Sequence, residues 1–79
     1  MEKNKQKLIY GISSKFEFGQ WHHGIVVFDD QEEANAWLQT EEYDFREREL
    51  FYSESKAIRL LGKGGKNRLA EARNLYIGE

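Results

Sequence analysis

The stretch that looks most like chemistry is GQWHHG (residues 19–24), where a tryptophan and two adjacent histidines lie between glycines. Paired imidazoles raise the question of a metal site or a catalytic base. In an extended strand, however, neighbouring side chains point to opposite faces, so His22 and His23 would not bind one ion. A zinc site needs further ligands, and the chain has no cysteine and no third histidine. No nucleophile or orienting acid pairs with either histidine by spacing, so we predict no metal, no cofactor and no catalytic base.

We interpret the same stretch as a contact for a partner. Between two glycines, Trp21, His22 and His23 are expected near the tip of a hairpin. Tryptophan is enriched at the few positions that carry most of the energy of a protein interface. The alternative is that the rings only cap the edge of a sheet.

Two other motifs suggest enzymes, and both fail. Residues 53–56, SESK, match the serine–lysine motif of penicillin-binding enzymes, but the other motifs of those enzymes and their larger scaffold are missing. Residues 62–67, GKGGKN, resemble a phosphate loop, but Leu60 and Asn67 stand where that motif needs glycine and Ser or Thr. A chain of 79 residues also leaves little room for a pocket beside its core. We therefore predict a protein that is not an enzyme.

A basic segment supports an alternative function. Glycine amides and lysines at the start of a helix can hold an anion, so this segment predicts a nucleic-acid-binding accessory module. Aromatic residues for base stacking are not interleaved with the bases, and a solvated turn between two helices explains the glycines equally well. The residues of this alternative site are Lys63, Lys66, Arg68 and Arg73.

Acidic residues gather earlier in the chain, nine of them between Asp29 and Glu49 against two arginines. Such a surface can steer a basic partner, although a well-capped helix start explains the first four acids without one. Alternating arginine and glutamate at the edge of a strand is a recognition device, because arginine binds carboxylates in a bidentate manner. The predicted acidic face is Asp29, Asp30, Glu32 and Glu33, and the predicted recognition strand holds Arg46, Glu47, Arg48 and Glu49.

Two strands are expected in the first third of the chain. From Leu8 to Phe18 apolar residues alternate with polar ones, which predicts a strand with one buried face and a bulge near residues 13–14. In the run GIVVF (residues 24–28), apolar residues occupy both the odd-numbered and the even-numbered positions, so both faces of a strand would be apolar. That pattern is typical of a central strand, or of a short strand wedged against helices. Glycines between the two runs predict an antiparallel hairpin.

Three helices and a third strand follow. Asp29 or Asp30 caps a helix whose apolar stripe is Ala34, Trp37 and Leu38. Residues 43–52 form an edge strand or, as the alternative, continue the helix. Ser53 caps a second helix, with Ala57, Leu60 and Leu61 inward and Gly62 at its end. Asn67 caps a third helix, with Leu69, Ala72 and Tyr76 on one face and Gly78 beyond its end.

Together these elements predict an α+β fold: a small antiparallel three-stranded sheet with helices on one face, in the order β-β-α-β-α-α. Residues 1–79 are expected to form one small globular domain, with residues 1–6 frayed. No apolar run approaches the length of a membrane span, so a cytoplasmic protein without membrane contact is predicted.

We interpret the chain as a small non-catalytic protein that binds a macromolecule. The preferred partner is a protein, on which the chain acts as a regulator or inhibitor. Its size and type resemble accessory proteins of phages and mobile elements. The edge strand can also pair with its own copy, which would give a homodimer.

Overall fold

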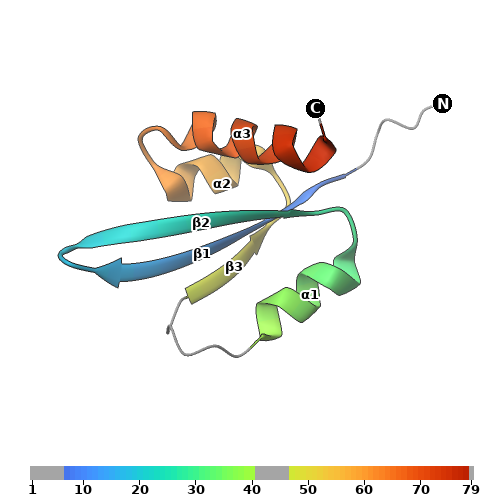
Figure 1. The fold of residues 1–79 in the computed structure, drawn as a ribbon, viewed down its shortest axis with the longest axis horizontal. Coiled ribbons are helices and arrows are strands. Elements are labelled where there is room, and N and C mark those ends of the chain that lie inside the picture. The colour runs from blue at the N-terminus through green and yellow to red at the C-terminus, as the bar shows by residue number, and fades with distance from the viewer. Residues whose placement is uncertain (1–6, 41–46, 79) are drawn as a thin grey trace.

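The central element is the nine-residue strand β1 (Ile9–Glu17). Two strands, β2 (Gln20–Phe28) and β3 (Glu47–Phe51), pair antiparallel with its edges in the order β2-β1-β3. The helices are α1 (Gln31–Gln39), α2 (Glu54–Leu61) and α3 (Gly65–Ile77), as Figure 1 shows. This computed structural model describes residues 7–40 and 47–78. The predicted α+β class, the antiparallel sheet of three strands and the element order are confirmed.

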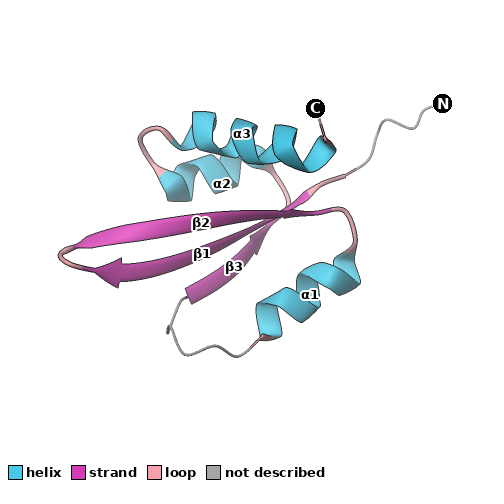
Figure 2. Cartoon of the chain, viewed as in Figure 1, coloured by secondary structure: helices cyan, strands magenta, loops and turns pink. Residues whose placement is uncertain are grey.

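The helices cover both faces of the sheet, whereas the sequence led us to expect one. Figure 2 shows α2 and α3 on one side and α1 on the other. Alternate residues of β1 explain this arrangement: Tyr10 and Ile12 belong to the core cluster with residues of α2 and α3, while Gly11 faces Trp37 of α1. A Cβ at Gly11 would lie 2.7 Å from the indole, so the missing side chain lets α1 approach.

Two helical layers also explain the apolar run in β2. This strand is an edge of the sheet and β1 is the centre, so the second of the two interpretations, a strand wedged against helices, fits. On β2, Val27 lies on the face of α2 and α3, and Phe28 packs against Trp37 on the face of α1. The register runs without interruption from Ile9–Phe28 to Glu17–Gln20, so the expected bulge near residues 13–14 is absent from β1.

The hairpin turns at Phe18 and Gly19, earlier than expected. Both residues have positive φ, 56° and 81°, as the tight two-residue turns of type I′ require. The residues Trp21, His22 and His23 therefore lie within β2 and not in the turn itself. The strand alternation continues through them, and each is paired with a residue of β1.

The helix ends follow local signals in most cases. Asp30 accepts a hydrogen bond from the amide of Glu33, and Ser53 from that of Lys56, as capping residues do. Gly62 and Gly78 end α2 and α3. The third helix begins at Gly65 after Gly64, so the prediction of Asn67 as its cap is wrong.

Close packing of two helices explains that earlier start. Gly65 is buried against Leu61, and a Cβ there would lie 2.5 Å from the Leu61 Cβ. The Gly65 amide also donates to the Gly62 carbonyl, which closes the turn between α2 and α3.

The strand interpretation of residues 43–52 is confirmed for Glu47–Phe51, which form an edge of the sheet. The predictions for Arg46 and for fraying of residues 1–6 lie outside the described residues.

Candidate functional site

Large aromatic side chains are exposed where β1 and β2 meet in the hairpin. Phe16 is 58% exposed, Phe18 89% and Trp21 51%. Phe16 and Trp21 are cross-strand partners, and their rings pack edge to face with centroids 5.3 Å apart. We call these three residues the hairpin surface. In Figure 1 the hairpin forms the left end of the molecule and extends beyond the turn between α2 and α3.

The Trp21 indole contacts His23, which in turn contacts Ser14. The His23 ring stacks parallel to the indole, with centroids 6.5 Å apart. His23 Nδ1 in turn shares a hydrogen bond of 2.7 Å with the hydroxyl of Ser14, which is buried. This chain of contacts connects the exposed indole to a buried residue of β1. Ser14 therefore has a positioning role that the sequence pattern did not reveal.

His22 and His23 lie on opposite faces of the sheet, as their adjacency in a strand predicts. The imidazole of His22 lies 3.3 Å from the carbonyl oxygen of Glu17, on the side away from Ser14. Among residues 7–40 and 47–78, no group of three or more His, Cys, Asp or Glu side chains converges as metal ligands would.

An open cavity of about 220 Å³ adjoins Trp21. It is lined by Ser14, His23, Glu47 and Leu60 besides the indole. Leu60 was expected to face the core with Ala57 and Leu61, but it is 40% exposed. The two neighbours fill the contact with the sheet, so the Leu60 side chain is left at the rim of the cavity.

The recognition strand is divided between the two faces of the sheet. Glu47 and Glu49 are exposed and lie on the side of α2, paired with Ser14 and Ile12. Arg48 points to the other side, where its guanidinium donates to the carbonyls of Trp37 (2.8 Å) and Thr40 (3.0 Å) at the end of α1.

The same guanidinium lies 5.2 Å from the Trp37 ring centroid. A cation at this position complements the negative end of the helix dipole and interacts with the π-face of the indole. Arg48 therefore anchors α1 to the sheet, a role that its alternation with glutamate did not suggest.

The acidic residues lie at the opposite end of the molecule from the hairpin surface, where β2 leads into α1 (Figure 1). Asp30 caps α1, and Glu32 and Glu33 occupy its first turn. Burial and the neighbouring Asp29 carboxylate raise the pKa of Tyr76 on α3. The predicted acidic face is therefore not brought together with the predicted contact at Trp21, His22 and His23.

The basic segment is also divided. The Arg68 guanidinium donates to the carbonyl of His23, and Arg73 pairs with Glu54 at 2.7 Å. Lys63 and Lys66 are exposed at the turn between α2 and α3.

Glu54 is the centre of a polar cluster that the sequence did not indicate. The Tyr10 hydroxyl donates to the same carboxylate oxygen as Arg73, over 2.7 Å. Burial of the hydroxyl and, to a smaller extent, its hydrogen bond to the Glu54 carboxylate and the charge of that group raise the pKa of Tyr10 to about 12. The hydrogen bond from Tyr10, helped by Arg73, lowers the pKa of Glu54. This cluster joins β1, α2 and α3 and belongs to the scaffold.

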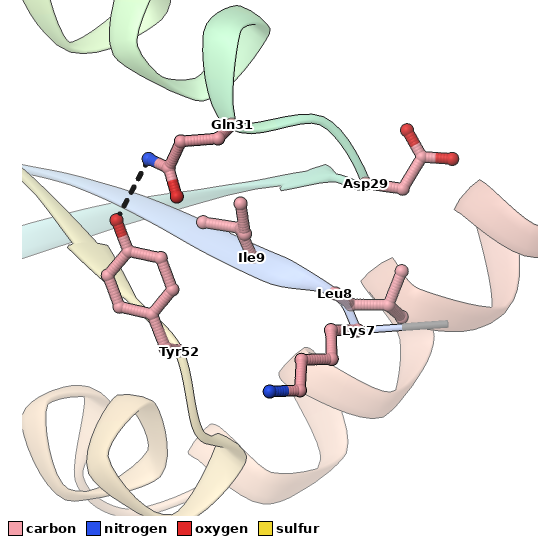
Figure 3. A pocket seen from close by; sticks show the side chains of 6 residues that line it. All are labelled: Lys7, Leu8, Ile9, Asp29, Gln31 and Tyr52. Atoms are coloured by element: carbon pink, nitrogen blue, oxygen red, sulfur yellow. Dashed lines mark hydrogen bonds between the residues drawn. The ribbon is translucent and has the colours of Figure 1, made fainter. Parts of the chain in front are cut away.

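A second cavity lies at the far end of the sheet, with a volume of about 530 Å³. Figure 3 shows its lining, in which the Gln31 amide donates to the Tyr52 hydroxyl over 3.0 Å. Its residues come from separate segments of the chain, so no sequence motif identifies it. The lining residues are Lys7, Leu8, Ile9, Asp29, Gln31 and Tyr52.

In comparisons with known proteins, no family model matches the chain, and no match was found among curated proteins or solved structures. Of the helices in the described ranges, none has the length and apolar character needed to cross a membrane.

Proposed function

We propose that this chain is a small non-catalytic protein that binds another protein through the hairpin surface and acts on it as a regulator or inhibitor. The observation that carries the proposal is the exposure of Phe16, Phe18 and Trp21 at one end of a very small domain. Aromatic rings are the largest source of core stability, and exposed aromatic patches are typical of interaction sites.

Phe18 supports the proposal most specifically. The residue has a φ of 56°, a conformation that a bulky side chain rarely adopts, and its ring is 89% exposed. Asparagine or glycine would suit this turn position better. A phenylalanine that adds local strain and buries almost nothing contributes little to folding, and such violations of local preference are expected at functional sites.

Trp21 supports it for a different reason. Interfaces gain affinity when their anchor side chains are already ordered, because less conformational entropy is lost on binding. The stacking of His23 and its hydrogen bond to Ser14 give the indole that order. Tryptophan anchors of this kind are enriched among interface hot spots.

Affinity capture from a native lysate tests the proposal, with the wild-type chain, Trp21→Ala and Leu75→Ala immobilised in parallel. Leu75 is an apolar residue of α3 that is 82% exposed, so its variant is a matched control away from the hairpin surface. We expect a protein retained by the wild type and the control and lost from Trp21→Ala. Circular dichroism would establish that all three chains are folded. Equal retention by Trp21→Ala would refute the proposal.

A second function, nucleic-acid binding, is favoured by one contact. The bond from Arg68 to the His23 carbonyl places part of the basic segment beside Trp21, so aromatic and basic groups adjoin in space. Single-stranded nucleic acid is bound by such combinations. A mobility shift with a single-stranded oligonucleotide tests it: binding should fall steeply with salt and disappear in Lys63→Glu/Lys66→Glu. Absence of a shift at low salt would exclude this function.

A further inference from the structure

An open groove continues from the hairpin surface along β3 and beneath α2. The cavity beside Trp21 shares Leu60 with a neighbouring cavity of about 390 Å³. Glu47, Glu49 and Phe51 alternate along one wall, all on the face of the sheet that α2 covers. We call this surface the β3–α2 groove; its lining residues are Ser14, Trp21, His23, Glu47, Glu49, Phe51, Lys56, Arg59 and Leu60.

The backbone beside this groove is an open sheet edge. Within residues 7–40 and 47–78, β3 pairs only with β1. In antiparallel sheets successive residues direct their amide and carbonyl groups alternately to either side. The His23 carbonyl accepts from Arg68 of α3, so it points away from β1, and its partner Ser14 therefore directs its groups toward β3. Ser14 pairs with Glu47, so Glu47 and every second residue after it direct their backbone groups toward β1. Leu50 lies between two such residues, and its backbone amide and carbonyl therefore point outward from the sheet.

The side chains around the groove differ along its length. At the end near the hairpin, Trp21 and Leu60 offer apolar surface. At the other end Lys56 and Arg59 of α2 are exposed, opposite the single acid Glu49. Among the described residues, neither base forms an ion pair with Glu49. This end therefore carries an excess of positive charge that a partner carboxylate would complement.

We propose that the β3–α2 groove binds an extended peptide segment of the partner, which adds to β3 as a fourth strand. Main-chain hydrogen bonds to the Leu50 edge hold the segment, and alternate side chains of the segment enter the groove. One of them is apolar, beside Leu60, and one is acidic, beside Lys56 and Arg59. This inference rests on the proposed protein-binding function and names the form and chemistry of the partner.

A second copy of this chain fits the edge less well. When β3 pairs with a second copy of itself about a two-fold axis, the residue on the axis lies opposite the same residue of the other copy. The register centred on Arg48 opposes two arginines, and the register centred on Glu49 opposes two glutamates. Of the registers centred on the three middle residues of β3, only the one centred on Leu50 brings no like charges opposite one another. Like charges directly opposite one another destabilise a strand pair. A second copy is thus limited to one of these registers, whereas a different segment with apolar and acidic side chains is not.

The test is selection of a random peptide library displayed on phage against the immobilised chain, followed by fluorescence anisotropy with a selected synthetic peptide. We expect the selected peptides to carry an acidic and an apolar residue an even number of positions apart, so that both side chains lie on one face of the added strand. Leu50→Pro removes the outward amide without removing a bond to β1, and proline is tolerated at such edge positions. It should weaken binding by about tenfold, because one backbone hydrogen bond is lost. The control Leu50→Ala shortens the same side chain but keeps the amide, so it should bind like the wild type.

The double variant Lys56→Glu/Arg59→Glu provides a second test that leaves β3 unchanged. Both side chains are exposed, so the fold should tolerate the reversal. It should select basic peptides in place of acidic ones. Unchanged selection, or equal peptide binding by Leu50→Pro and Leu50→Ala, would overturn the inference. So would a dimer, detected by light scattering, that Leu50→Pro dissociates. If Leu50→Pro retains the captured partner while Trp21→Ala loses it, the groove is wrong and the protein-binding function stands.

Discussion

Glu54 links three elements through one carboxylate. It lies in the first turn of α2 and accepts hydrogen bonds from Tyr10 of β1 and Arg73 of α3, both over 2.7 Å. Its side chain is 43% exposed, so solvent screens part of the attraction to Arg73. The Tyr10 bond is better protected, because that residue is only 3% exposed.

Replacing this carboxylate should therefore destabilise the protein. We expect Glu54→Ala to lower the free energy of unfolding by about 1 kcal/mol, since a buried hydroxyl loses its acceptor and the exposed ion pair adds little. Glu71→Ala removes an exposed acid from α3 and is the control, with a change within about 0.5 kcal/mol. Urea denaturation at neutral pH measures both. Equal stability of the two variants would contradict the role of Glu54.

The same cluster predicts how stability changes with pH. The pKa of Glu54 is lowered on folding, so its contribution is present above the usual value of 4.5 and is lost as the pH falls through the folded value. The pKa of Tyr10 is raised to about 12, so its contribution is complete below 10.0 and is lost as the pH rises through about 12. Urea midpoints across the pH range should fall at both ends. In Tyr10→Phe the alkaline decline should be shallower, and an unchanged decline would disprove the assignment.

At the scale of elements, the close approach of α2 and α3 depends on a missing side chain. Alanine normally stabilises a helix by about 1 kcal/mol relative to glycine. At Gly65 we expect the opposite sign, because the added Cβ would lie 2.5 Å from the Leu61 Cβ and force the helices apart. Gly65→Ala should lower the melting temperature, whereas Asn67→Ala in the same turn should not. A higher melting temperature for Gly65→Ala would show that the two helices can separate without loss.

The turn at Phe18 should also respond to substitution. Asparagine before glycine is favoured in turns with positive φ at both residues. We therefore expect Phe18→Asn to raise the stability of the hairpin by about 0.5–1 kcal/mol, measured by thermal unfolding. Lower stability in this variant would mean that the phenyl ring packs against the fold and is not held for a partner.

Local signals in the sequence were sufficient for the element types. Capping by Asp30 and Ser53 involves residues three positions apart, and the alternation of β1 is a property of consecutive residues. The side of the sheet on which a helix packs depends instead on distant contacts, such as that between Gly11 and Trp37. Sequence patterns do not contain that information, so they did not reveal that α1 packs on the face opposite α2 and α3.

The candidate site shows the same division. Trp21 and His23 could be selected from the sequence of residues 19–24, and the structure places both beside one cavity. Phe16 and Phe18 fit the alternation of apolar residues that predicts one buried face of β1. Both are exposed, because the hairpin extends past the helices that would cover them (Figure 1). Arg48 resembled a surface charge because its partners are backbone carbonyls of α1. A sequence pattern does not indicate which backbone carbonyls will accept a hydrogen bond from a side chain.

For the whole molecule, the separation of its surface features limits how it can bind. The acidic start of α1 and the cavity near Tyr52 lie at one end, and the hairpin surface lies at the other (Figure 1). The principal extents of 47 × 28 × 21 Å describe an elongated body, so one compact partner site would not cover both ends. The exposed aromatic residues and the β3–α2 groove adjoin one another, and they form the surface that we assign to the partner.

The most direct measurement combines stability and binding in Phe18→Asn. Its melting temperature would be compared with that of the wild type, and its capture of the partner from lysate with that of Leu75→Ala. We expect a chain that is at least as stable as the wild type and no longer retains the partner. A stable Phe18→Asn chain that captures the partner as well as the wild type does would contradict the claim that the hairpin surface is the binding site.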